Sequence, residues 1–125
     1  MAVVSVAGAA FTVDLGATQY EDQITSGTID TTPTITRTKT LNDVAFDQTD
    51  LNSTVSLEFL YDENSGMYAA IQTAIAAGAS VAVGIDSATG AWTGAAMHIE
   101  SANTSFAADG VATCSVSFTG TVTFA

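Results

Sequence analysis

The stretch Thr54–Tyr61, TVSLEFLY, decides the fold, because polar and apolar side chains alternate along it from Thr54 to Phe59. Every second side chain from Val55 to Tyr61 is apolar, whereas Ser56 and Glu58 point to the other side of an extended chain. A period of two residues is typical of a strand that buries one face and exposes the other. The stretch therefore predicts a central strand of a β domain.

The C-terminal sequence continues this alternation. Ser80–Ile85 has the same period of two, and so does the last segment, Thr113–Phe124, in which Gly120 is the expected place for a bulge or bend. Asp109 and Gly110 form a strong turn signal, since both residue types tolerate positive φ. We therefore expect residues 91–106 to pair with the last segment as a hairpin.

One helix is expected among these strands, over Gly66–Ala77. Asn64 or Ser65 can cap its start, and Gly78 can end it. An apolar stripe suited to packing on a sheet consists of Met67, Ile71, Ala74 and Ile75.

The N-terminal half is less regular. Strands are expected at Val3–Val6, Ala10–Asp14, Ile24–Ile29 and Thr34–Leu41, followed by a long loop over Asn42–Ser53. The apolar start is interpreted as the first strands, with a cleaved signal peptide as the alternative. The whole chain, residues 1–125, is expected to be one domain: an antiparallel β-sandwich or flattened barrel with one flanking α-helix.

Composition excludes several functions. The 125 residues hold 13 Asp and Glu but only two Lys and Arg, a net charge of −11. Ordinary nucleic-acid binding needs clustered Lys and Arg, and docking on anionic lipid needs them too. The composition therefore argues against both functions. Two interpretations of the negative charge stay open: repulsion between copies keeps them in solution, or the surface repels a polyanion. With one cysteine the chain has no internal disulfide.

The residues that could carry chemistry form no catalytic pattern. His98 stands in a probable strand without a partner pattern, and Cys114 alternates with core residues; a dyad of the two stays open. Asp43, Asp47 and Asp50 lack the spacing of a calcium loop. We therefore expect no enzyme activity, no cofactor and no metal.

Five residues are candidates for contacts between copies. Arg37 and Lys39 lie two apart and project from one face, where they can offset acids of a neighbouring copy. Val44, Phe46 and Leu51 stand among acids in the expected loop, where a phenyl ring has little reason to be exposed unless it contacts a partner. With one Lys and one Pro, the chain also has few residues to blunt its sheet edges.

The order of these elements resembles the major tail proteins of long-tailed phages. The resemblance rests on TVSLEFLYDENSGMYAAIQTAIAAGASVAVGID (Thr54–Asp86) and GAWTGAAMHIESANTSFAADGVATCSVSFTGTV (Gly90–Val122), with weaker support from Ile24–Thr40. It covers about the last seventy residues by the succession of patterns, and no single motif is diagnostic.

The resemblance implies two packed sheets and homohexameric rings stacked into a hollow tube, with one continuous inner barrel. Its partners are then other copies, a tape-measure protein, a tail terminator and tail-tip or baseplate proteins. Genomic DNA passes through without specific binding, and no membrane is involved. The location is the virion tail, after assembly in the host cytoplasm, and the tail is expected to be non-contractile.

The resemblance also assigns places in the tube. Asn42–Ser53 matches the loop that reaches neighbouring subunits, and Glu58 is a candidate for an acid facing the lumen. The chain ends on a strand, so no C-terminal arm or decoration domain is expected. Two alternatives stay open: an immunoglobulin-like binding or decoration module of a virion or cell surface, and the inner tube of a contractile injection system.

Overall fold

The computed structural model describes residues 8–16, 18–20, 24–61, 66–87 and 89–125. They are mostly antiparallel β structure with one α-helix, which confirms the expected fold class. In chain order the elements are η1 (Gly8–Ala10), β1 (Thr12–Leu15), β2 (Thr18–Gln19), β3 (Ile24–Lys39), β4 (Val44–Leu60), α1 (Gly66–Ala77), β5 (Val81–Asp86), β6 (Ala91–Ser105), β7 (Thr113–Gly120) and β8 (Thr123–Phe124).

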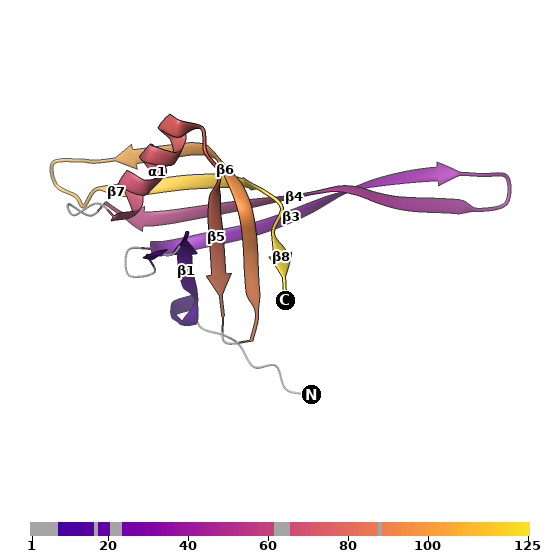
Figure 1. Cartoon of the computed structure of the whole chain (residues 1–125), viewed down its shortest axis with the longest axis horizontal. Helices are drawn as coiled ribbons and strands as arrows, with labels where there is room; N and C mark the ends of the chain where they lie inside the picture. The colour runs from indigo at the N-terminus through magenta and orange to yellow at the C-terminus, as the bar shows by residue number, and fades with distance from the viewer. Residues whose placement is uncertain (1–7, 17, 21–23, 62–65, 88) are drawn as a thin grey trace.

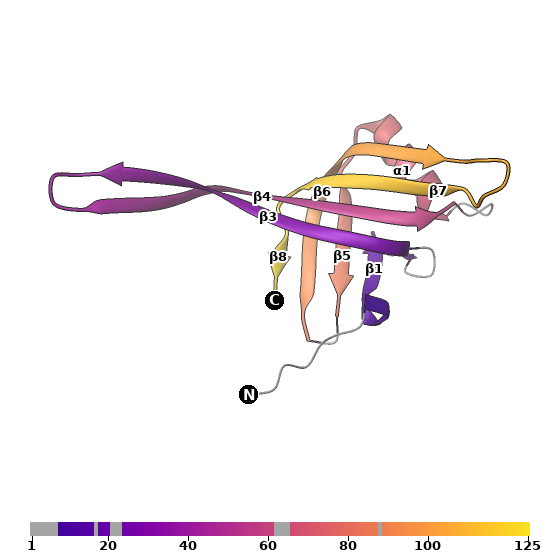
Figure 2. The same cartoon turned by 180° about the vertical axis from the view of Figure 1, so that it is seen from behind.

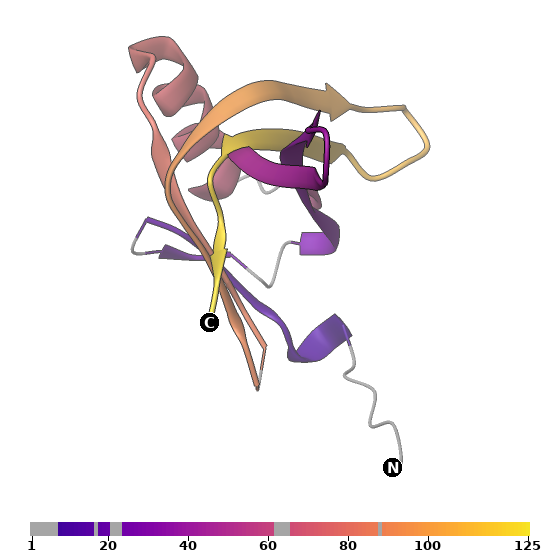
Figure 3. The same cartoon turned by 90° about the vertical axis from the view of Figure 1, so that its right-hand side faces the viewer.

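Two layers share the strand β6. Its first half pairs with β5 and β8, and its second half, from His98 onward, pairs with β7. The strand order is β2-β1-β5-β6-β7-β4-β3. Figure 3, seen along the long axis, shows β6 curving from one layer into the other, with α1 on one side. The lower layer is β1, β5, β8 and the start of β6; we call the other, β6-β7-β4-β3, the front sheet.

The core lies between these layers and under α1. From the front sheet it takes alternate residues, such as Leu57 and Phe118, and from the helix it takes Met67 and Ile71. The buried apolar set is Val13, Leu15, Val55, Leu57, Phe59, Met67, Ile71, Val83, Ile85, Met97, Cys114, Val116, Phe118 and Val122.

Helix α1 spans the predicted range, and Gly78 ends it with φ of +64°, as a helix-terminating glycine does. The proposed caps Asn64 and Ser65, and the expected strand Val3–Val6, lie outside the described residues. The last segment divides at Gly120 into β7 and β8, as expected. There the packing leaves no room for a side chain, since an added Cβ would stand 2.8 Å from the Met97 sulfur.

Two N-terminal expectations are wrong. The segments Ile24–Ile29 and Thr34–Lys39 belong to one continuous strand, β3, because Pro33 is tolerated on an edge strand, and Leu41 lies beyond the end of that strand. The expected loop Asn42–Ser53 is mostly strand, since β4 begins at Val44 and pairs with β3 along its whole length. The pairing skips one residue of β4 beside Pro33, which is a β-bulge.

β3 and β4 extend well beyond the body as a two-stranded ribbon. β4 pairs with β7 only over Ser53–Leu60, so residues 33–51 form a hairpin without a third strand. We call this hairpin the arm; Figure 1 shows it projecting along the long axis, and Figure 2 shows the same from behind. About eight residues of extended chain separate Pro33 from the tip, a reach of roughly 26 Å.

Candidate functional site: the polar face and the arm

The outer side of the front sheet is lined by small polar side chains. Directly paired residues share a face, so register defines rows across β3, β4, β7 and β6. The rows are Ser26, Glu58, Ser115 and Asn103; Thr28, Ser56, Ser117 and Ser101; and Asp30, Thr54, Thr119 and His98. We call these twelve residues the polar face. They include two acids and no Lys or Arg.

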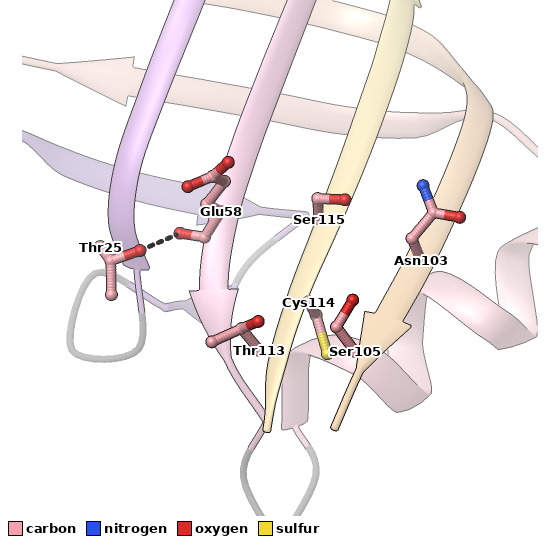
Figure 4. A pocket seen from close by; sticks show the side chains of 7 residues that line it. All are labelled: Thr25, Glu58, Asn103, Ser105, Thr113, Cys114 and Ser115. Atoms are coloured by element: carbon pink, nitrogen blue, oxygen red, sulfur yellow. Dashed lines mark hydrogen bonds between the residues drawn. The ribbon is translucent and has the colours of Figure 1, made fainter. Parts of the chain in front are cut away.

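Glu58 lies in the middle of this face, as the alternation in its strand predicted. Its Oε2 accepts a hydrogen bond from Ser26 Oγ at 3.2 Å, and its backbone carbonyl accepts one from Thr25 Oγ1 at 3.2 Å. Figure 4 shows Glu58 beside Ser115 and Asn103 over a shallow depression of about 220 Å³. The carboxylate is exposed, so it contributes negative charge to an open surface.

The polar face is stabilised by hydrogen bonds between hydroxyl groups and by the core behind it. Ser56 and Ser117 pair across β4 and β7 at 3.2 Å. On the reverse side of the same strands, Leu57 and Phe118 are almost completely buried. The strands of the polar face are therefore held from behind by apolar packing, whereas its own side chains are polar.

Both margins of the front sheet are open. Among the described residues, no strand pairs with the outer edge of β3, and β6 pairs only with β7 from His98 onward. Unpaired N–H and C=O groups at such margins are templates for another strand.

The arm has two unlike faces. Opposite pairs place Arg37 beside Phe46, Lys39 beside Val44 and Ile35 beside Gln48, all on one side. The other side carries mainly threonines from β3. We call the first side the apolar–cationic face: Ile35, Arg37, Lys39, Val44, Phe46 and Gln48.

The structure thus brings four of the five predicted contact residues together. Leu51 lies nearer the root of the arm, paired with Pro33. Leu41, at the tip, was not predicted and is fully exposed. The turn is held by Thr40, whose N–H donates to Asp43 O at 2.8 Å, and by Asp43 Oδ1, which accepts from Val44 N–H at 2.7 Å.

The catalytic candidates do not meet. Cys114 is buried, and its sulfur lies 3.5 Å from Thr104 Oγ1. His98 is exposed and pairs with Thr119, five residues further along β7, which is about 16 Å away. This separation excludes a catalytic dyad of Cys114 and His98. No group of metal-binding side chains is found within the described ranges. In the same part of the chain, no helix is long and apolar enough to cross a bilayer.

The sequence and the structure of the chain were each compared with known proteins. No family model matches the sequence, and no curated protein matches it by sequence. Among solved structures, a chain of "Virion of native gene transfer agent (GTA) particle" aligns with TM-score 0.80 and 10% identity, over 97% of this chain and 99% of that one.

Two further structures agree. A chain of the PVC extracellular contractile injection system, sheath/tube terminator in the extended state, aligns with TM-score 0.80 and 11% identity, over 100% of this chain and 99% of that one. A chain of the tail of the empty GTA particle, refined with C6 symmetry, gives TM-score 0.77 and 13% identity, over 97% and 99%. The fold is therefore a phage tail tube-like fold.

Proposed function

We infer that this chain is a non-enzymatic building block of a tail tube, in which six copies form a ring and rings stack around a hollow lumen. One observation carries the proposal: a polar sheet face, packed from behind on the core and bounded by two open margins. The margin of β3 in one copy can pair with the margin of β6 in the next, which closes the sheet into a continuous barrel. The C6 symmetry of the similar GTA tail supports a ring of six.

The polar face then lines the lumen. Serine and threonine hydroxyls keep the wall wetted, and Asp30 and Glu58 repeat around each ring. These carboxylates repel the phosphates of DNA within a Debye length of about 8 Å. With no Lys or Arg among its twelve residues, this wall offers DNA no counter-charge, so a duplex slides past without specific binding.

The arm supplies contacts between copies. Phe46 is 69% exposed within its own chain, although a phenyl ring gains most from burial. Arg37 and Lys39, the only Lys and Arg in the sequence, lie on the same face. A neighbour of net charge −11 attracts them. Val44 and Leu51 extend the contact along β4.

The tube function defines the remaining partners and the location. The partners are a tape-measure protein in the lumen before ejection, a tail terminator at one end and tip or baseplate proteins at the other. The tube belongs to the tail of a virion with a non-contractile tail and is assembled in the host cytoplasm.

The inner tube of a contractile injection system is the second candidate. The similarity to the PVC structure, as high as that to the GTA virion, favours it. The two candidates differ in whether a sheath surrounds the tube. Electron microscopy of particles from producing cells distinguishes them, because only the contractile system has a sheath around its tube.

A labelling experiment tests whether the polar face lines a lumen. Glu58→Cys places a thiol on the polar face, and Gln72→Cys places one on the exposed side of α1 as a control. Cys114 is 3% exposed and does not compete for the reagent. A maleimide carrying a folded protein should label both variants before assembly, but only Gln72→Cys after assembly.

Negative-stain microscopy of the same samples supplies the second readout. Hollow filaments in which the Glu58→Cys thiol is protected support the tube. Rings that never elongate indicate a terminating cap, and dispersed monomers at every concentration indicate a decoration module. Equal labelling of the two variants in filaments contradicts the lumen assignment.

A further inference from the structure

The two margins of the front sheet carry the ends of the rows that form the polar face. Figure 2 shows β3 and the second half of β6 as its outermost strands, with β4 and β7 between them. Each row therefore begins on one margin and ends on the other. The end residues, with β3 first, are Ser26 and Asn103, Thr28 and Ser101, and Asp30 and His98. Neighbouring strands are antiparallel throughout, so β6 of one copy and β3 of the next also run antiparallel when the margins join.

His98, the only histidine of the chain, lies exposed on the β6 margin. A hollow of about 120 Å³ beside it is lined by Ala74, Ile75, Gly78, Ala79, His98 and Ile99. The elements around this part of β6 are α1, β5 and β7, and their only charged residue is Asp86, which pairs with Ala91 at the far end of β6. On β6 itself the acid is Glu100, the exposed extra residue of a bulge. Along these described elements, Glu100 is therefore the one acid near His98.

Asp30 is the only charged residue of β3 before the arm, over Ile24–Thr32. It is exposed, and its neighbour in the row is Thr54 of β4. Arg37, the nearest cation along β3, is seven residues further on, roughly 23 Å away. Within one chain Asp30 and His98 lie on opposite margins, three strand spacings or about 14 Å apart. The two side chains therefore meet only if a second copy brings them together.

Register decides which residues meet across the junction between two copies. A slip of one residue turns the polar side chains of the next copy toward its core, so only even shifts keep the polar face continuous. With no shift, each row continues into the same row of the next copy, and His98 meets Asp30. A shift of two residues either way places Thr28 or Thr32 opposite His98 instead. The unshifted register is therefore the one that brings the histidine to the acid.

We propose that rings close in the unshifted register, with the imidazole of His98 paired with the carboxylate of Asp30 in the neighbouring copy. The inference rests on the proposed tube function and names the register and the ion pair at each junction. Charge complementarity between the two margins supports a second copy as the occupant of each margin.

The ion pair makes ring closure depend on pH. An imidazole changes its charge between about pH 5 and 8. The protonated ring of His98 offsets two carboxylates at the junction, those of Glu100 and of Asp30 from the neighbour, whereas the neutral ring offsets neither. Closure that favours the protonated ring takes up a proton, so it strengthens as the pH falls through this range and weakens as the pH rises.

A disulfide cross-link in the full-length chain measures the register. Directly opposite residues of antiparallel strands have Cα atoms about 4.5–5.5 Å apart, which suits a disulfide. Asp30→Cys with His98→Cys should therefore give, after oxidation of rings seen by negative-stain microscopy, a covalent ladder of up to six copies on a denaturing gel. The matched control is Thr28→Cys with His98→Cys, because Thr28 is displaced along β3 by about 7 Å. An equal or higher yield in the control, or no cross-link in either variant, overturns the register.

Sedimentation at a series of pH values measures the ion pair without cysteines. The unmodified chain should assemble at a concentration about threefold lower at pH 6 than at pH 8. His98→Gln should lose this pH dependence. Asp86→Asn, which removes one acid away from the junction, should retain it. Equal pH dependence in His98→Gln and in the unmodified chain overturns the ion pair. If the unmodified chain forms no rings at any pH, the tube function itself fails.

Discussion

Replacing Phe46 by Ala is expected to weaken assembly and leave the folded monomer almost unchanged. The ring is 69% exposed in the single copy, so its truncation removes few contacts within the chain. Surface substitutions of this kind usually alter the free energy of unfolding by no more than about 0.5 kcal/mol. The monomer should therefore keep its circular dichroism spectrum and its thermal midpoint.

The effect on assembly follows from the exposed fraction. Complete burial of a Phe side chain contributes up to about 3 kcal/mol. Since 69% of the side chain is still available, a partner that covers it adds about 2 kcal/mol, a factor of roughly 30 in the association constant. In the proposed tube, six arms of a ring act together, so the summed loss would approach about 12 kcal/mol for a whole ring.

Sedimentation across a concentration series, with negative-stain microscopy, measures the concentration at which filaments appear. Phe46→Ala should raise it at least about 30-fold. Ile75→Ala is the control, because Ile75 is an exposed apolar residue of α1 outside the arm. Filament formation by Phe46→Ala at the unmodified concentration would refute the reasoning. So would a marked fall in the monomer's thermal midpoint, which would mean that Phe46 packs within its own chain.

Three further changes test the wall and the fold. Glu58→Lys should leave filaments intact but make them retain short DNA duplexes at low salt, measured by co-sedimentation, and release them as salt rises. Ser53→Ala should lower the free energy of unfolding by about 1–3 kcal/mol, because the buried Val122 N–H loses the Ser53 Oγ acceptor at 3.3 Å; thermal or urea denaturation measures it. Gly78→Ala should cost about 1 kcal/mol in the same assay, since its φ is +64°.

Local patterns sufficed to predict much of the fold. Helix α1 and the strands after it follow from periodicity and from Gly78, which are properties of short segments. The arm was missed because the alternation in β4 is interrupted by the bulge opposite Pro33, which shifts the phase between Phe46 and Leu51. Its strand character depends on the partner β3, and a strand partner is not a local property.

Less of the candidate site than of the fold could be predicted from the sequence. Alternation alone identified Glu58 as an outward-facing acid. The rows that place it beside Ser26, Ser115 and Asn103 depend on the register of four strands distant in the sequence. Phe106 and Val111 flank the turn that Asp109 and Gly110 predicted, and the structure adds that both side chains are exposed and that this turn lies at one end of the long axis (Figure 1).

The two ends of the described chain meet around the one tryptophan. Trp92 stacks on Phe11, with ring centroids 5.9 Å apart, and contacts Phe124 at 4.8 Å. Intrinsic fluorescence therefore reports the docking of β8 and of the segment before β1 onto the lower layer, far from the arm. Emission that stays constant during polymerisation would mean that subunits join as preformed bodies, whereas a spectral shift would reveal rearrangement of the chain termini.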